Sequence, residues 1–297
     1  MAETVLAIFG PTASGKSSVA EAIADRIPAE LVSADSMQVY RGLPILSNQP
    51  ERPTRLVATW PLDHEASVGD YQRLAHEAID EIIGAGKTPV VVGGTGLYLR
   101  AALTRLELPP PPEPGARRRW EEFYDAHGAV HAHGRLQALD PEAAAAVHPN
   151  DRRRVVRALE LAEAGSSLAG GKLWSEAYRR PTLIFGLEVP PEELERRIEA
   201  RTRAMFEAGV EDEVRSALAG PISRTARHML GLEEIASLDR EQAIETLIVR
   251  TRRYAAYQRK WLRRTPGVVS VRADRPAAEV ADEILQVART RERLPPG

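Results

Sequence analysis

Cysteine is absent from this chain of 297 residues, which excludes disulfide bonds and thiolate chemistry. No apolar run approaches the roughly twenty residues that a membrane-spanning helix needs. The N-terminus also lacks the basic segment and long apolar run of an export signal. The net charge of −2 shows no overall excess of positive charge, and only four of the 40 basic residues are lysine. We therefore expect a cytoplasmic protein without a membrane segment, in which any nucleic-acid binding depends on local clusters of arginine.

Buried strands alternate with amphipathic helices in the first hundred residues. Apolar or strand-like runs cover 4–9, 30–35 and 88–96, and helical spacing of apolar residues covers 15–26 and 70–84. Alternation of this kind is typical of a doubly wound α/β core with a parallel sheet.

The pattern changes after a proline-rich stretch at 108–115. The next seventy residues or so read as helical, and strand character returns only at 181–189. We therefore predict a helical insertion domain over 109–180 between two parts of one α/β domain, 1–108 and 181–297. The second part should contain helices near 191–208, 209–219, 231–238, 240–264 and 276–290, with a last strand at 267–273.

A phosphate-binding loop lies between the first predicted strand and helix. The sequence GPTASGKS matches G-x-x-x-x-G-K-[ST] in full, and the match consists of Gly10, Pro11, Thr12, Ala13, Ser14, Gly15, Lys16 and Ser17. The glycines let backbone N–H groups point at an anion, Lys16 supplies a positive charge, and the Ser17 hydroxyl is a ligand for Mg²⁺. The fold class is thus predicted as α/β, a P-loop NTPase-like parallel sheet core with a helical insertion domain.

This motif indicates a diphosphate or triphosphate ligand but not the reaction. The strand at 88–96 carries no acid for Mg²⁺, whereas the strand at 30–35 ends in Asp35. If that strand lies beside the first, Asp35 faces the loop. Its carboxylate can then act as a general base, hold a metal ion through water, or cap a turn.

Six motifs occur in the order found in one known family. They are GPTASGKS, SADSMQVYRG, VVGGTGLYLRA, HPNDRRRVVRALE, RIEARTRAMFEAGVEDEV and SRTARHMLGLEEI. Together they resemble the tRNA dimethylallyltransferases from residue 5 to about 265. The resemblance implies transfer of a dimethylallyl group from dimethylallyl diphosphate to N6 of the adenosine beside the anticodon (position 37), with Mg²⁺ as cofactor.

The resemblance assigns roles at the reacting centre. The loop would hold the diphosphate, Asp35 would take the N6 proton, Thr95 would hydrogen-bond at the centre, and Arg201 would add positive charge. Exocyclic N6 is a poor nucleophile, so the reaction needs both a stabilised leaving group and a base. Arg197, one helical turn before Arg201, is a weaker candidate, because an ion pair with a neighbouring glutamate explains it equally well.

The expected partner is the anticodon stem-loop of tRNA, bound by a monomer. The resemblance assigns contacts with tRNA to Asp35, Ser36, Met37 and Gln38, and in the insertion to the helix that carries Arg153, Arg154 and Arg157. A second cluster of arginines at 117–119 adds Arg117 as a predicted contact. Gln38 would read or hold the flipped adenine. The basic helix at 240–264, with its interleaved aromatic residues, also suits RNA.

Departures from the family pattern leave some details open. Pro44–Pro50 replaces the usual Asp-Ile-Gly-Thr-Ala-Lys-Pro, and unusual residues stand at Leu232, Glu233, Tyr257 and Lys260.

Three alternative functions remain: an adenylate dimethylallyltransferase acting on free nucleotide, a P-loop nucleotide kinase using ATP, and an RNA-binding module without activity. The insertion and the basic helix argue against the first, since a nucleotide-sized acceptor does not require them. A kinase would need a set of lid arginines and a different acceptor pocket, and the intact Lys16, Ser17, Asp35 and Thr95 argue against an inactive module.

Overall fold

The structure is a computed structural model that describes residues 3–108, 113–168 and 177–292. The chain divides into two compact units, one of residues 1–105 with 174–297 and one of residues 106–173. Within the larger unit, described residues form a six-stranded sheet in which every neighbouring pair is parallel. The predicted fold class, an α/β protein with a parallel sheet core and a helical insertion, is confirmed.

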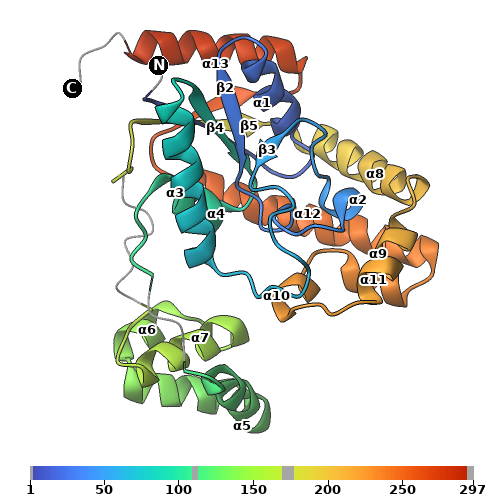
Figure 1. Ribbon diagram of the computed structural model, residues 1–297. Coiled ribbons are helices and arrows are strands. Elements are labelled where there is room, and N and C mark those ends of the chain that lie inside the picture. The colour runs from blue at the N-terminus through green and yellow to red at the C-terminus, as the bar shows by residue number, and fades with distance from the viewer. Residues whose placement is uncertain (1–2, 109–112, 169–176, 293–297) are drawn as a thin grey trace. The chain divides into compact units, whose positions relative to one another are not determined.

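The sheet has the strand order β3-β2-β4-β1-β5-β6. Figure 1 labels four of these strands, β2, β3, β4 and β5. Its strands are β1 (Val5–Phe9), β2 (Ala29–Ser33), β3 (Thr54–Arg55), β4 (Thr88–Gly93), β5 (Thr182–Glu188) and β6 (Val268–Arg272). The first strand after the smaller unit, β5, pairs directly with β1, with Leu6 opposite both Val90 of β4 and Leu183 of β5. The two parts of the larger unit therefore share one sheet and one core.

The sequence left open whether the strand that leads to Asp35 lies beside β1; in the structure it does not, because β4 lies between them. All six residues of β4 are buried, whereas β2 begins with two half-buried residues. A strand that is apolar on both faces is most stable in the middle of a parallel sheet, so β4 takes the central place. Asp35 still reaches the site, since parallel strands bring their carboxyl ends to one edge.

Helices cover the sheet. α1 (Lys16–Ala24) packs against α13 (Ala277–Glu292), and Ile23 and Ile284 join Leu6, Ile8 and Val90 in one buried core. The alternate strand residues are buried as well, because α3 (Val68–Gly84) and α4 (Gly96–Leu103) pack against the strands and each other. None of the described helices is long and apolar enough to cross a membrane.

A second group of helices stands next to the carboxyl edge of the sheet. They are α2 (Pro44–Ser47), α8 (Pro191–Glu207), α9 (Val210–Leu218), α10 (Arg224–Arg227), α11 (Leu232–Ser237) and α12 (Arg240–Arg264). Glu213 of α9 accepts the N–H groups of Ile45 and Leu46, each at 2.8 Å, and so caps the first turn of α2. This ties the segment that departs from the family pattern to α9.

The described residues of the smaller unit form three helices, α5 (Ala116–Leu139), α6 (Pro141–Ala146) and α7 (Arg152–Glu163). Its buried core includes Leu136, Val155 and Leu159. α5 is interrupted at Gly128, where φ is 80° and ψ is 169°. Asp151 caps the start of α7, where its side chain accepts the Arg154 N–H at 3.1 Å.

Candidate active site

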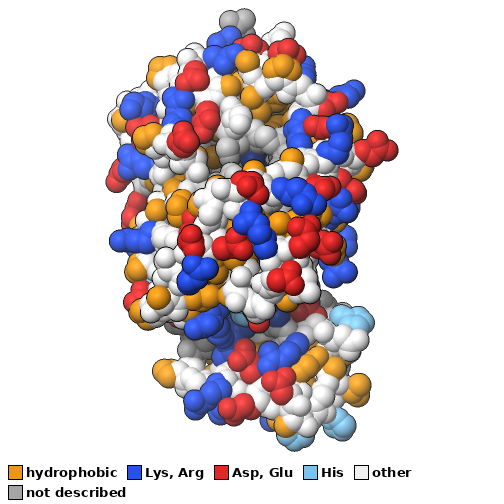
Figure 2. Space-filling view, turned by 90° about the vertical axis from the view of Figure 1, so that its right-hand side faces the viewer, with side chains coloured by type: hydrophobic (Ala, Val, Ile, Leu, Met, Phe, Trp, Pro, Cys, Tyr) orange, Lys and Arg blue, Asp and Glu red, His pale blue; other side chains and the backbone are white. Residues whose placement is uncertain are grey.

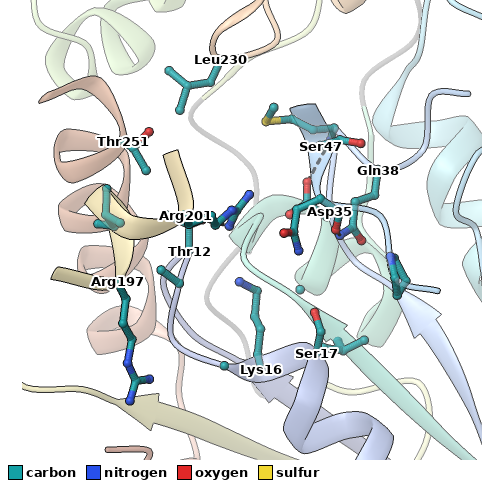
Figure 3. A pocket seen from close by; sticks show the side chains of 18 of the residues that line it. Thr12, Lys16, Ser17, Asp35, Gln38, Ser47, Arg197, Arg201, Leu230 and Thr251 are labelled. Atoms are coloured by element: carbon teal, nitrogen blue, oxygen red, sulfur yellow. Dashed lines mark hydrogen bonds between the residues drawn. The ribbon is translucent and has the colours of Figure 1, made fainter. Parts of the chain in front are cut away.

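A cavity of about 360 Å³ lies at the carboxyl edge of the sheet. Its walls come from the β1–α1 loop, the segment after β2, and α2, α8 and α12. Figure 3 shows Lys16 and Ser17 on one side, with Leu230 and Thr251 across the cavity. Apolar side chains also line it: Met37, Leu46, Met205, Leu230 and Leu247.

The β1–α1 loop has the shape of an anion-binding loop. Gly15 and Ala13 adopt positive φ values of 85° and 63°, which turn the chain before α1 begins at Lys16. A Cβ atom at Gly10 would come within 2.7 Å of the Ser14 hydroxyl, so Ser14 or the loop would have to shift to admit a side chain there. The N–H groups at the start of α1 are thereby available to a diphosphate.

Two cations from different elements face this loop. Burial lowers the pKa of Lys16 from 10.5 to about 8, and the charge of Asp35 offsets part of that shift. Burial also lowers the pKa of Arg201, whose Nη1 donates a hydrogen bond of 2.8 Å to the Thr12 hydroxyl. Figure 3 shows Lys16, Arg201 and Asp35 pointing toward the same space. The negative charge of a bound anion would offset the free-energy cost of burying both cations.

Arg197 has a different environment from Arg201. It forms an ion pair of 2.6 Å with Glu193 and donates to the Ala273 carbonyl at 3.3 Å. It touches the cavity wall, but in Figure 3 its guanidinium points away from Lys16. The ion pair is therefore the better description of this residue.

Asp35 follows β2 by two residues and lies in a tight turn. Its Oδ1 accepts the Met37 N–H at 2.9 Å, so one carboxylate oxygen caps the turn while the side chain lines the cavity. Thr95 supports the same segment: its Oγ1 accepts the Ser36 N–H at 3.1 Å and lies 3.5 Å from the Tyr254 hydroxyl. Thr95 thus contacts the turn that carries Asp35.

Gln38 lines the cavity with an amide that is engaged at both ends. Its Oε1 accepts the Ser33 hydroxyl at 2.8 Å, and its Nε2 donates to the Asn48 carbonyl at 2.8 Å. Contact with an adenine edge would require at least one of these bonds to be exchanged. The sequence alone does not reveal this, because Ser33 and Asn48 are neighbours of Gln38 only in the folded chain.

One wall of the cavity was not expected from the sequence. Thr251, Tyr254 and Gln258 of α12 line the cavity, although the sequence assigned this helix to RNA. Their spacing of three and four residues places them on one face of the helix, and this pattern in the sequence could have predicted that they act together. Burial raises the pKa of the Tyr254 hydroxyl, so it stays protonated and can donate.

No cluster of three or more His, Asp and Glu side chains able to hold a metal ion occurs among the described residues. Ser17 and Asp35 both line the cavity, one with a hydroxyl and one with a carboxylate. Mg²⁺ often keeps several waters and binds through one or two protein oxygens plus substrate phosphates. The residues present fit such an ion, held in part by its substrate.

The arginines predicted to contact tRNA fall into two groups. Arg117 and Arg157 are half-buried and lie 3.8 and 3.2 Å from the buried carboxylate of Glu160. Arg153 and Arg154, at the start of α7, have exposed side chains. In the larger unit, the face in Figure 2 shows acidic and basic side chains interspersed rather than one broad basic patch.

A parallel sheet whose first strand runs through a phosphate-binding loop into a helix defines a P-loop α/β protein. The profile described as IPP transferase matches residues 38–265, and the one described as isopentenyl transferase matches residues 3–57. A protein of Thermobifida fusca (strain YX), named tRNA dimethylallyltransferase, is 41% identical over 283 residues, which cover 89% of this chain and 88% of that protein.

Comparison with solved structures points to the same family. The crystal structure of the full-length tRNA isopentenylpyrophosphate transferase from Bacillus halodurans has 31% identity and a TM-score of 0.69, with 98% of each chain covered. A eukaryotic dimethylallyltransferase acting on tRNA has 25% identity and a TM-score of 0.77, with 97% of this chain and 80% of that chain covered. The chain belongs to the IPP transferase family.

Proposed function

We propose that this protein is a tRNA dimethylallyltransferase, which transfers the dimethylallyl group of dimethylallyl diphosphate to N6 of the adenosine beside the anticodon. One observation carries the proposal: Lys16, Arg201 and Asp35 face a single cavity from three different elements. Two cations suit a leaving diphosphate, and a carboxylate suits the removal of a proton from the acceptor.

The reaction breaks the bond between the allylic carbon and the diphosphate oxygen and forms a bond from N6 to that carbon. Negative charge grows on the diphosphate as it leaves, so the N–H groups of the loop and the charges of Lys16 and Arg201 stabilise the transition state. Apolar side chains opposite the loop suit the five-carbon group and exclude water. Exclusion of water matters because water would otherwise capture the allylic cation.

Asp35 is proposed as the base for the N6 proton. Its Oδ1 is held by the Met37 N–H, which fixes the carboxylate in the cavity and leaves Oδ2 for the acceptor. We further propose Mg²⁺ as the cofactor, with Ser17 as its protein ligand. The ion would neutralise charge on the diphosphate.

For tRNA, the proposed contacts in the segment after β2 are Asp35, Ser36, Met37 and Gln38. In the smaller unit they are Arg117, Arg153, Arg154 and Arg157. Exposed Arg153 and Arg154 are suited to direct phosphate contact, whereas Glu160 restrains Arg117 and Arg157. A monomeric state and a cytoplasmic location stay predictions.

Labelled dimethylallyl diphosphate tests the proposal when it is offered with bulk tRNA, AMP or ATP in parallel. Transfer to tRNA alone is the expected result, and mass spectrometry of the nucleosides should show a dimethylallyl group on adenosine. Transfer to AMP or ATP would favour the free-nucleotide alternative. Phosphoryl transfer from labelled ATP would favour a kinase.

A further inference from the structure

A buried amide joins two loops of the active site. Gln258 of α12 is only 2% exposed. Its Oε1 accepts the Thr12 N–H at 2.8 Å, and its Nε2 donates to the Gly94 carbonyl at 2.9 Å. The side chain therefore connects the phosphate-binding loop after β1 with the turn after β4. An amide is the group suited to this position, since it offers one acceptor and one donor at the same end.

The turn after β4 is shaped around this amide. A Cβ atom at Gly94 would lie 2.2 Å from Gln258 Nε2 and 3.1 Å from the Gly10 carbonyl oxygen. Two residues on, a Cβ atom at Gly96 would lie 2.3 Å from the Trp261 ring. These two glycines allow the backbone to approach α12 closely. Gly94 and Gly96 are therefore needed for the packing of α12, whereas the glycines of the β1–α1 loop shape the anion-binding site.

Thr12 connects Gln258 to the catalytic cation. Its N–H donates to Gln258, and its hydroxyl accepts from Arg201 Nη1 at 2.8 Å. The backbone and side chain of one residue are thus held by two different partners. Because the Thr12 N–H is engaged, a diphosphate has to use N–H groups further along the loop.

We propose that Gln258 is a positioning residue for the diphosphate site: it fixes Thr12 and thereby the direction of the Arg201 guanidinium. The inference rests on the proposed function, because it treats Arg201 as the cation that meets the leaving group. Gln258 itself touches the loop and need not touch either substrate. Displacement of a reacting group by about an ångström can cost about a hundredfold in rate, so a lost tether is measurable.

Gln258→Met in the full-length protein tests the inference, because methionine has similar volume but neither hydrogen bond. We expect kcat for prenyl transfer to fall by about ten- to a hundredfold. The KM for tRNA should stay unchanged, and inorganic diphosphate should bind more weakly in calorimetry. Gln286→Met, the same substitution at an exposed position of α13, is the matched control and should leave all three quantities unchanged.

A double-mutant cycle with Arg201→Lys separates positioning from simple structural support. If Gln258 acts through Arg201, Gln258→Met should lower kcat only slightly further in a protein that already carries Arg201→Lys. Fully multiplicative losses, or a loss of tRNA affinity equal to the loss of kcat, would overturn the inference. Should Gln258→Met fail to fold, Gln258→Asn keeps an amide but is one methylene shorter, so it can no longer bridge Thr12 and Gly94, and the same cycle applies.

The proposed function and the role of Gln258 fail separately. If the unmodified protein transfers no prenyl group to tRNA, the proposed function is wrong. If it transfers the group and the losses multiply, only the role of Gln258 is wrong.

Discussion

The guanidinium of Arg201 donates a hydrogen bond of 2.8 Å to the hydroxyl of Thr12, across 189 residues of sequence. This bond fastens a cation of α8 onto the β1–α1 loop. The loop by itself would hold phosphates of many kinds. Arg201 and Asp35 line the same cavity as this loop, and in the proposed function they make it a site where a diphosphate leaves and a proton is removed.

The first prediction concerns Lys16. Lys16→Ala should lower the rate of prenyl transfer by at least about a hundredfold, because it removes a cation from the place where charge develops. Binding of tRNA should survive, since Lys16 lies inside the cavity. Filter binding beside a transfer assay measures both, and an equal loss of tRNA affinity would contradict the prediction.

The pH dependence of diphosphate binding follows from the same side chain. Burial lowers the pKa of Lys16 to about 8 in the unliganded protein, so above that pH a growing fraction carries a neutral amine. A bound diphosphate favours the charged form and raises this pKa. Affinity for dimethylallyl diphosphate should therefore be greatest below pH 8 and fall up to tenfold per pH unit above it. Lys16→Met should bind weakly with little pH dependence in this range, and a flat profile for the unmodified protein would refute the prediction.

Gly94→Ala should resemble the loss of Gln258. The new Cβ atom would collide with the buried amide at 2.2 Å, so the turn after β4 or the side chain of Gln258 must move. We expect a lower kcat together with a lower melting temperature. Gly84→Ala is the control: it ends α3, nothing lies within 4 Å of its Cβ position, and helix propensity favours alanine.

Two arginines of the smaller unit can be separated from the rest by their surroundings. Arg153→Ala with Arg154→Ala should weaken tRNA binding without a change in melting temperature, because both side chains are exposed. The slope of log affinity against log salt should become shallower by about 0.7–0.9 for each phosphate that is no longer bound. Arg157→Ala should also reduce thermal stability, since it removes an ion-pair partner of buried Glu160. An unchanged salt slope in the double variant would mean that Arg153 and Arg154 are solvent-exposed side chains that do not contact tRNA phosphates.

Local patterns in the sequence predicted much of this site. The loop from Gly10 to Ser17 is a contiguous motif, and β1 and α1 on either side follow from apolar spacing. Asp35 was predicted to follow the end of a strand, but the neighbours of that strand were left open, because strand order depends on which strand is most completely buried. Gln258 was missed since its two partners lie 246 and 164 residues away. Its polar character looked like part of a basic surface helix, and only the fold shows that it is buried.

Asp35→Asn distinguishes the three roles that the sequence left open for this carboxylate. An asparagine Oδ1 can still accept the Met37 N–H, so the turn should persist and both substrates should bind nearly normally. If Asp35 is the base for the N6 proton, the variant should lose about 10²–10⁴-fold in turnover. A metal-binding role predicts instead a raised Mg²⁺ requirement, with activity recovered at high Mg²⁺. A purely turn-capping role predicts a lower melting temperature with a near-normal rate in the folded fraction. A magnesium titration beside a thermal melt therefore decides between them, and recovery of rate at high Mg²⁺ would exclude Asp35 as the general base.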